Sequence, residues 1–174
     1  MKKILITGLA GSGKSTLAKL MSNEYETYDI ETIEGIFHHV DRDTHEEVVE
    51  RDPNSIHSAN HTLWECDLEQ LKELFVAQQD EVALYFGVGS NIKEIAQLFD
   101  QVIVLSATKE EIQARLSERH PGEYGQEPEV QKLILEGKEA WEDSLRNDGA
   151  AVISELSSQE EVVQQVVATI NQSA

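Results

Sequence analysis

Residues 8–15 of the sequence, GLAGSGKS, place glycines, a lysine and a serine at a spacing that can bind phosphate. The glycines let the backbone turn so that several N–H groups point to one side, at the start of a helix, where they can donate to phosphate oxygens. Lys14 adds a full positive charge, and Ser15 offers a hydroxyl to a magnesium ion that bridges the outer phosphates. The segment therefore predicts a P-loop. The residues expected to contact the nucleotide are Gly8, Gly11, Ser12, Gly13, Lys14, Ser15 and Thr16.

Two carboxylates, Asp29 and Glu31, stand at the end of a candidate strand at 25–30, in which Glu and Thr alternate with Tyr. They are two positions apart, which puts them on one face of a strand. A carboxylate there can orient an acceptor hydroxyl toward the γ-phosphate or hold a water of Mg²⁺. The alternative is that both are ordinary solvated acids in a chain with 33 of them. No Walker B carboxylate follows the apolar runs 82–86 and 101–105, so metal binding is expected to rest on Ser15, water and Asp29.

Two arginines, Arg115 and Arg119, are one helical turn apart and can project together. The planar guanidinium group can stack on a ring and also bind phosphate oxygens with two parallel hydrogen bonds. Pairing with Glu111 or Glu118 is the alternative. His57 and His61, four residues apart and followed by Cys66, suggest a metal site, but no second cysteine pair supports it, and a surface or substrate-pocket role is favoured.

Alternating apolar patterns indicate the elements that must hold these side chains in place. Five buried strands are expected at 2–7, 25–30, 82–86, 101–105 and 150–153. Helices are expected between them, at 13–22, 63–79, 92–99, 109–119 and 130–145, and a last helix should begin at the capping box Ser158-x-x-Glu161. This alternation predicts a three-layer α/β fold with a five-stranded, mainly parallel sheet.

Two segments interrupt the pattern. Residues 31–62 hold five of the six histidines, a proline and many acids, and are interpreted as a specialised insertion. Residues 119–128 carry two prolines and two glycines, which predicts a mobile loop that can act as a lid. With no internal repeat or linker, residues 1–174 are expected to form a single domain.

Composition narrows the partners and the compartment. The formal net charge of −19 makes nucleic acid and anionic membrane poor candidates, because binding to both depends on Lys and Arg. No apolar run reaches the roughly 20 residues of a membrane span. A single cysteine excludes an internal disulfide, so a cytoplasmic location is expected.

The arrangement as a whole resembles the small P-loop kinases, the superfamily of adenylate kinase, shikimate kinase and the nucleoside and nucleotide kinases. The resemblance runs from the loop at 8–16 through Asp29, the strand ending at Gly87, the segment 99–105 and the helix with Arg115 and Arg119. Residues 119–128, with YGQEP at 124–128, look like a poorly characterised branch of kinase-like ATPases. The resemblance implies ATP and Mg²⁺ as cofactors, helices on both faces of the sheet and the strand order 2-3-1-4-5.

The same resemblance implies roles for individual residues. Lys14, Asp29 and Arg119 match catalytic positions: Lys14 holds the phosphates, Asp29 serves the acceptor or the metal, and Arg119 meets the transferring phosphate. Arg115 matches an arginine that stacks on adenine. The acceptor site of the family corresponds to residues in the insertion and just after it, with Gly87 and Asn91 at its mouth. These are Phe37, His38, His39, Arg42, Arg51 and Trp64.

The predicted function is therefore a kinase that transfers the γ-phosphate of ATP to a small molecule, such as a nucleoside, a nucleotide or a hydroxylated metabolite. A GTPase is excluded because no Asp has a Gly three residues later and no Asn-Lys-x-Asp occurs. Two alternatives stay open: an ATPase or regulatory module without a metabolite acceptor, favoured by the single lid arginine, and a non-enzymatic binding protein. The acceptor and the oligomeric state cannot be predicted from these residues.

Overall fold

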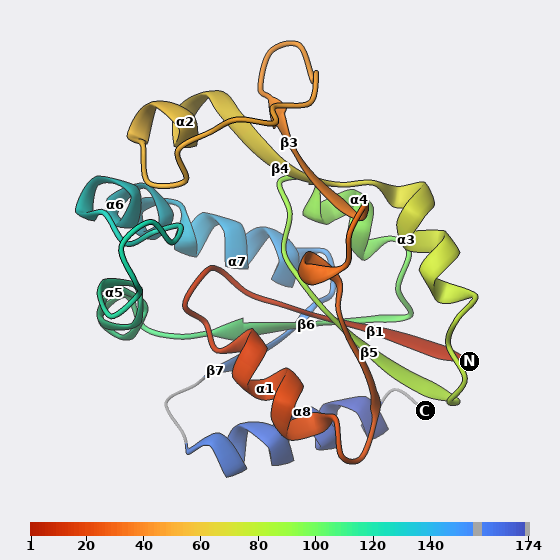
Figure 1. Cartoon of the computed structure of the whole chain (residues 1–174). Coiled ribbons are helices and arrows are strands. Elements are labelled where there is room, and N and C mark those ends of the chain that lie inside the picture. The colour runs from red at the N-terminus through yellow and green to blue at the C-terminus, as the bar shows by residue number, and fades with distance from the viewer. Residues whose placement is uncertain (155–157, 173–174) are drawn as a thin grey trace.

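A sheet of five parallel strands forms the centre of the molecule (Figure 1). The computed structural model describes residues 1–154 and 158–172. The sheet consists of β1 (Lys2–Thr7), β2 (Glu26–Asp29), β5 (Val82–Phe86), β6 (Gln101–Ser106) and β7 (Ala151–Ser154). Its middle strand, β1, pairs in parallel with β5 on one side and β6 on the other. Ile4, Leu5 and Ile6 are fully buried because helices cover both faces of the sheet, which explains the uninterrupted apolar run.

The strand numbering differs from the expected 2-3-1-4-5. The residues that the structure describes contain seven strands, and the main sheet has the order β2-β5-β1-β6-β7. The two strands that were not predicted, β3 (Phe37–Asp41) and β4 (Thr62–Cys66), pair antiparallel with each other outside the main sheet. Because both precede the third strand of the sheet, they change the number of every later strand.

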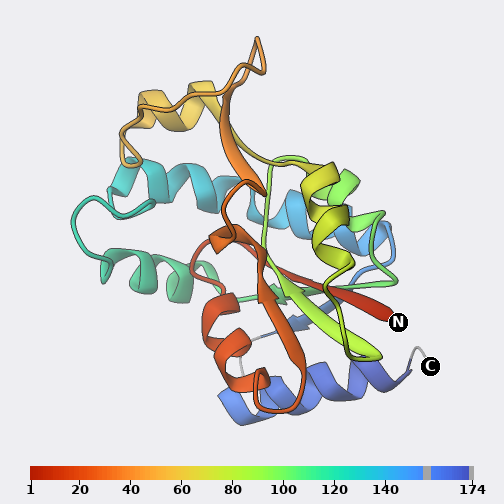
Figure 2. The ribbon, with the colours of Figure 1, turned by 45° about the vertical axis from the view of Figure 1, so that its right-hand side comes forward.

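Helices lie on both faces of the sheet (Figure 2). α1 (Lys14–Met21) and α8 (Gln159–Gln172) pack on the face that carries Ile4 and Ile6. The opposite face is covered by α3 (Leu68–Phe75), α4 (Ile92–Ala96) and α7 (Lys138–Asn147). The predicted capping box is confirmed, since Glu161 N donates to Ser158 Oγ (3.3 Å) and Ser158 N donates to the Glu161 carboxylate (2.8 Å). No helix within 1–154 or 158–172 has the length and apolar character that a membrane crossing requires.

The segment 31–62 projects from the carboxyl edge of the sheet as a small substructure of its own (Figure 1). It begins within the short 3₁₀ helix η1 (Ile30–Thr32) and continues through β3 to α2 (Ile56–His61). Helix α2 leads directly into β4. The helix predicted over 63–79 is therefore wrong in its first part. Thr62, Leu63 and Trp64 are β-formers, and their pairing with β3 overrides the helical pattern that begins at Leu68.

The predicted helix over 130–145 is also two helices, α6 (Pro128–Glu136) and α7, which meet at Gly137. Glycine is a poor helix former, so an apolar pattern alone misses the break. Helix α5 (Lys109–Ser117) ends two residues before the expected Arg119, and the predicted lid joins it to α6. Within the lid, Gly125 is buried against Leu116 of α5 and Ile134 of α6. This contact ties the segment to both helices.

Candidate functional site

The P-loop segment forms the turn between β1 and α1 at the carboxyl edge of the sheet. Gly11 and Gly13 have φ angles of 83° and 95°, a left-handed conformation that other residues rarely adopt. Ser12 is 1% exposed, and its hydroxyl has no hydrogen-bond partner in the described parts of the chain. A buried hydroxyl without a protein partner, within a left-handed glycine turn, is suited to donate to a phosphate oxygen.

Gly8 is packed too tightly for any side chain. A Cβ atom at this position would lie 2.4 Å from Ser12 Oγ and 2.7 Å from the carbonyl oxygen of Leu105 in β6. We expect Gly8→Ala to lower the free energy of unfolding by about 1–3 kcal/mol, because the backbone of the loop must move away from β6. Gly137→Ala is the control, since a Cβ there meets nothing within 4 Å. Urea denaturation measures both variants, and equal stability would contradict the role of close packing at Gly8.

Lys14 begins α1 and turns back over the loop. Its Nζ donates to the carbonyl of Gly8 (2.8 Å) and lies 3.7 Å from Glu31 Oε1. Burial lowers the pKa of Lys14, and the Glu31 and Asp29 carboxylates oppose that effect. Because an ammonium group that has lost water gains strongly from a new anion, a phosphate group would find a poorly solvated cation here.

Glu31 is the carboxylate that contacts most of the site. It reaches across from η1, and its two oxygens accept hydrogen bonds from Trp64 Nε1 (3.3 Å) and Val88 N (3.1 Å). Burial raises the pKa of Glu31, while Lys14 lowers it to a smaller extent. Asp29 ends β2, close enough to influence the pKa values of both Lys14 and Glu31. The structure thus brings Lys14, Asp29 and Glu31 together.

The hydrogen bond from Val88 N to Glu31 places a carboxylate near the end of β5, where the sequence has no Walker B acid. No acid follows β5 in the sequence, but Glu31 of η1 places its carboxylate on the backbone just beyond that strand. At the end of β6, Ser106 donates to Glu142 (2.9 Å), which is itself paired with buried Lys138 (2.8 Å). The charge of Glu142 is therefore compensated by Lys138, away from the loop. Glu31 is the carboxylate that contacts the lysine of the loop.

The donor set at the loop suits Mg²⁺. Ser15 and Thr16 are exposed at the first turn of α1, and Asp29 ends the neighbouring β2. Mg²⁺ is commonly held by one or two protein oxygens together with waters and substrate phosphates, so a hydroxyl and a carboxylate are sufficient. The described residues contain no cluster of three His, Cys, Asp or Glu side chains suited to holding a metal by themselves.

That finding also answers the suggestion of a metal site at His57, His61 and Cys66. The two imidazole rings lie edge to face with centroids 4.2 Å apart in α2, but Cys66 does not join them in a metal-binding cluster within the described chain. Burial raises the pKa of the Cys66 thiol to about 12, which keeps it protonated.

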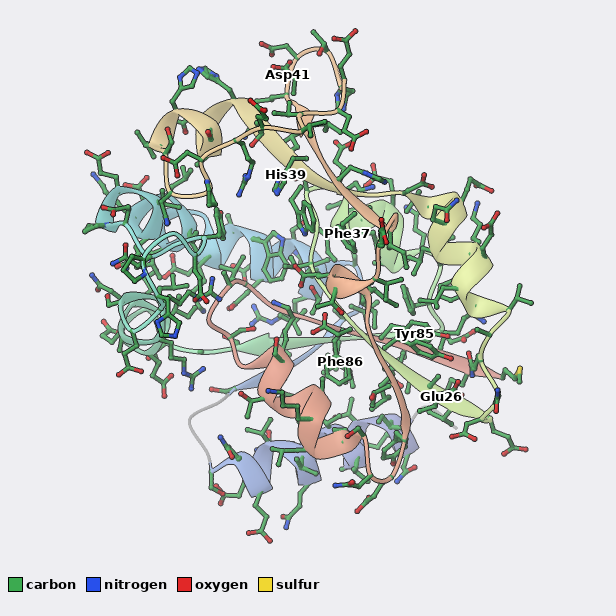
Figure 3. The ribbon with its side chains drawn as sticks, in the orientation of Figure 1. Glu26, Phe37, His39, Asp41, Tyr85 and Phe86 are labelled. Carbon is green, nitrogen blue, oxygen red and sulfur yellow. The ribbon has the colours of Figure 1, made fainter. Side chains whose placement is uncertain are left out.

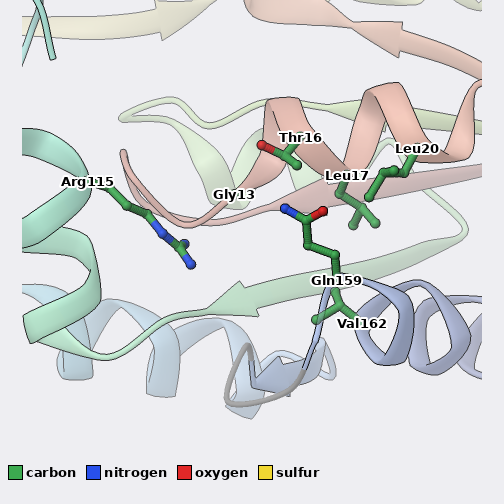
Figure 4. A pocket seen from close by; sticks show the side chains of 7 residues that line it. All are labelled: Gly13, Thr16, Leu17, Leu20, Arg115, Gln159 and Val162. Carbon is green, nitrogen blue, oxygen red and sulfur yellow. The ribbon is translucent and has the colours of Figure 1, made fainter. Parts of the chain in front are cut away.

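Arg115 borders a pocket of about 150 Å³ beside the loop (Figure 4). One of its guanidinium nitrogens donates to the carbonyl of Gly11 (2.9 Å). Figure 4 shows Arg115 extending from α5 toward Gly13, with Gln159 of α8 on the other side of the space. The remaining lining residues are Thr16, Leu17, Leu20 and Val162. The pocket has an apolar wall and a planar cation, a combination suited to a flat heteroaromatic ring.

Arg119 lies at the start of the predicted lid. Its guanidinium donates to the carbonyl of Tyr124, and its charge is near enough to lower the pKa of Lys14. The lid also touches the insertion, because Gln126 N donates to Asn54 Oδ1 (3.2 Å) and Arg51 lies over the Tyr124 ring, 5.8 Å from its centroid. The mobility predicted for the lid stays a prediction.

Aromatic side chains line one face of the β3–β4 hairpin above Glu31. The Trp64 ring stacks on Phe37 (5.2 Å between centroids) and is tilted against His39 (4.3 Å). Figure 3 shows Asp41, His39 and Phe37 following one another along β3 toward the sheet. His38, one position out of phase, points elsewhere and contacts the carbonyl of Gly35 (2.9 Å) and Glu47 (3.5 Å).

The two residues expected at the mouth of this site shape the backbone. A Cβ at Gly87 would lie 2.6 Å from Ile30 Cγ1, so the absence of a side chain lets η1 approach β5. Asn91 binds both backbone groups of Cys66, with its amide donating to the carbonyl (2.9 Å) and its oxygen accepting from the N–H (3.0 Å). Together, Gly87 and Asn91 hold η1 and β4 against β5 and α4.

His39 gives the site a dependence on pH. Burial, helped by the nearby charge of Arg51, lowers the pKa of His39 from 6.5 to about 4. Between these values the unfolded chain binds a proton that the folded chain does not, so the free energy of unfolding falls as the pH drops from about 6.5 to 4. We expect His39→Gln to reduce this fall and His57→Gln, at an exposed position, to leave it unchanged. Urea denaturation at several pH values measures it, and identical pH slopes for His39→Gln and wild type would contradict the burial effect.

A family model described as an AAA domain matches residues 4–144. The chain belongs to this family. A sequence search of curated proteins gives no match.

Three kinases illustrate the similarity in fold. Shikimate kinase from Acinetobacter baumannii in complex with shikimate has a TM-score of 0.61 and 17% identity, with 99% of this chain and 94% of that one covered. Shikimate kinase from Bacteroides thetaiotaomicron has a TM-score of 0.58 and 19% identity, with 98% of each chain covered. Deoxyadenosine kinase from M. mycoides with bound dATP has a TM-score of 0.57 and 15% identity, with 97% and 99% covered. At these identities the likeness shows the α/β fold of this AAA domain, with its parallel sheet flanked by helices.

The sequence pattern favours Asp29 over Glu31 as the functional acid, whereas the structure gives Glu31 more contacts in the site. One of these contacts, the hydrogen bond from Trp64 to Glu31, joins β4 to η1 and cannot be predicted from the local sequence. It depends on the β3–β4 hairpin that the sequence pattern did not predict. An acid two residues after Asp29 was the only local sign of it.

Proposed function

We propose that this AAA domain is an ATP- and Mg²⁺-dependent kinase that transfers the γ-phosphoryl group of ATP to a hydroxyl of a small molecule. The observation that carries the proposal is the 3.7 Å approach of Lys14 Nζ, at the end of a glycine turn, to the half-buried carboxylate of Glu31. A phosphate-binding cation and an acid with a raised pKa face each other, so an acceptor hydroxyl between them can be deprotonated beside the phosphate that it attacks.

Binding of the nucleotide involves three parts of the site. The N–H groups of residues 11–14 and the Ser12 hydroxyl donate to the β-phosphate, and the Lys14 ammonium contacts the outer phosphates. The adenine ring enters the pocket lined by Arg115 and Leu17. Ser15 and Asp29 would hold Mg²⁺. When bound, Mg²⁺ supplies positive charge to the β- and γ-phosphate oxygens.

In the transfer step, the acceptor oxygen forms a bond to the γ-phosphorus while the bond from that phosphorus to the β,γ-bridging oxygen breaks. The hydroxyl proton passes to Glu31, and the bridging oxygen leaves with ADP. Lys14 and Arg119 stabilise the charge on the transferring oxygens, and the lid at 119–128 excludes water that would compete with the acceptor.

The test is a screen with ATP, Mg²⁺ and a panel of nucleosides, nucleotides and hydroxylated metabolites, in which phosphorylated products are detected by mass spectrometry. We expect at least one acceptor to gain a phosphoryl group while ATP is converted to ADP in equal amount. ADP formation at the same rate with and without every acceptor, and no phosphorylated product, would contradict a kinase.

An ATPase without a metabolite acceptor is the second candidate. The observation in its favour is that Arg119 is the only arginine in the lid segment 119–128, and its guanidinium already donates to the Tyr124 carbonyl. In this case water takes the place of the acceptor, and the screen yields inorganic phosphate with all panel members.

A further inference from the structure

Arg51 forms no ion pair with any described residue, although burial has removed part of its hydration. It follows the hairpin turn of the insertion and is half-buried, and none of the described carboxylates lies within 4.0 Å of its guanidinium. Its direct contacts are with neutral groups: NH1 donates to Thr62 Oγ1 (3.4 Å), and the guanidinium lies over the Tyr124 ring. Burial lowers the pKa of Arg51, and the more distant charge of Asp52 only partly opposes that effect. In a chain with 33 acids, a half-buried arginine without a carboxylate partner is unusual, because desolvating a charge costs free energy that a partner normally offsets.

The surroundings of Arg51 lead directly to the proposed reaction centre. Thr62, its hydrogen-bond partner, is on the same face of β4 as Trp64, two residues further along. The Trp64 ring touches His39 on one side, and its indole N–H donates to Glu31 (3.3 Å). Glu31 in turn is 3.7 Å from Lys14. One continuous wall therefore runs from the guanidinium of Arg51 to the phosphate-binding lysine.

Two further observations indicate that this wall binds a ligand. His39 Nδ1 is buried and has no hydrogen-bond partner within the described residues, so the wall has an unused polar atom next to Arg51. Tyr124, which covers Arg51, belongs to the lid, while Thr62 belongs to the insertion. Arg51, itself part of the insertion, thus contacts both the insertion and the lid segment.

We propose that the acceptor of this kinase carries a carboxylate, which Arg51 binds while an acceptor hydroxyl lies between Glu31 and Lys14. This inference rests on the proposed function and names the substrate class as a small hydroxy acid. With one face against Tyr124 and NH1 turned to Thr62, the guanidinium keeps an edge for two parallel hydrogen bonds to a carboxylate. A phosphate monoester carries nearly two negative charges and would leave one of them uncompensated by this single arginine.

The experiment compares the binding of matched acids and neutral polyols by isothermal titration calorimetry in the presence of ADP and Mg²⁺. The probes are gluconate against glucitol and glycerate against glycerol, with glycerol 3-phosphate as the phosphate probe. We expect an acid to bind wild-type protein about ten- to a hundredfold more tightly than its neutral counterpart, the effect of a charged hydrogen-bonded pair. Arg51→Gln should remove that preference.

Arg146→Gln is the control, because Arg146 is an exposed arginine in the last turn of α7 whose guanidinium is paired with Asp143, outside the proposed site. It should keep the preference for acids. ADP affinity in Arg51→Gln shows whether that variant is folded. If it is not, Arg51→Lys keeps the charge and loses the paired hydrogen bonds, so it should bind the acid more weakly than wild type and more tightly than the polyol.

The outcomes separate this inference from the proposed function. Acids that bind no better than polyols, an acid preference that survives Arg51→Gln, or tighter Arg51-dependent binding of glycerol 3-phosphate than of glycerate would each overturn it. A neutral polyol phosphorylated equally by wild type and Arg51→Gln would overturn it and leave the kinase standing. Arg51-dependent binding of a hydroxy acid without any phosphoryl transfer would support it and overturn the kinase.

Discussion

Lys14→Ala is expected to remove most of the stabilisation that ATP and Mg²⁺ give to the protein. The Lys14 ammonium is poorly solvated and contacts the Gly8 carbonyl and the Glu31 carboxylate. A further contact with phosphate oxygens is therefore expected to be worth about a hundredfold in affinity. At an ATP concentration of a hundred times the wild-type Kd, ligand binding stabilises the native state by about 2.7 kcal/mol. A hundredfold weaker Kd reduces this to about 0.4 kcal/mol.

Thermal denaturation with and without ATP and Mg²⁺ measures the effect. Lys19→Ala is the control, because Lys19 is an exposed lysine in the last turn of the same helix. Its ATP-dependent shift in Tm should equal that of wild type. Equal shifts for Lys14→Ala and wild type would show that ATP does not bind at this loop.

Glu31→Gln is expected to lower kcat by about 10² to 10⁴ while ATP affinity changes little. The substitution keeps the size of the side chain and an oxygen that can accept from Val88, but it removes the group that takes the acceptor proton. Because burial raises the pKa of Glu31, wild-type turnover should fall on the acid side as this carboxyl is protonated. That acid limb should be missing in the variant.

Steady-state kinetics over a range of pH, with ATP affinity measured separately, tests this expectation. Glu34→Gln, an exposed acid three residues further on, should behave as wild type. Asp29→Asn should also slow turnover more than it weakens ATP binding, but with a higher Mg²⁺ requirement, because Asp29 is assigned to the metal. A Glu31→Gln enzyme that loses only ATP affinity would assign Glu31 to nucleotide binding.

The parts of the site that the sequence predicted are those made by neighbouring residues. The loop at 8–15, its strand and its helix are a local pattern of glycines between apolar residues, and the structure has them where the pattern indicated. The helices on both faces followed from the buried strands, because an apolar run such as Ile4–Ile6 needs cover on both sides.

The parts that the sequence did not predict depend on pairing between distant residues. In the β3–β4 hairpin, His39 pairs with Trp64 across a long insertion, and the apolar pattern from Leu68 onward favoured a helix over 63–79 instead. The contacts of Glu31 with Trp64 and of Arg51 with Thr62 both depend on this hairpin. The acceptor side of the site was therefore less predictable from the sequence than the phosphate-binding loop.

The position of β1 in the middle of the sheet has a consequence for biosynthesis. Its neighbours are β5 and β6, so this strand finds its second hydrogen-bonding partner only when Gln101–Ser106 have emerged from the ribosome. Gly8 is held against Leu105 of that same strand, so the loop cannot take its final shape earlier. A ligand of this loop therefore cannot assist folding of the nascent chain before β6 has been translated. Until then, the apolar side chains of β1 lack one of the two strands that flank them in the folded sheet.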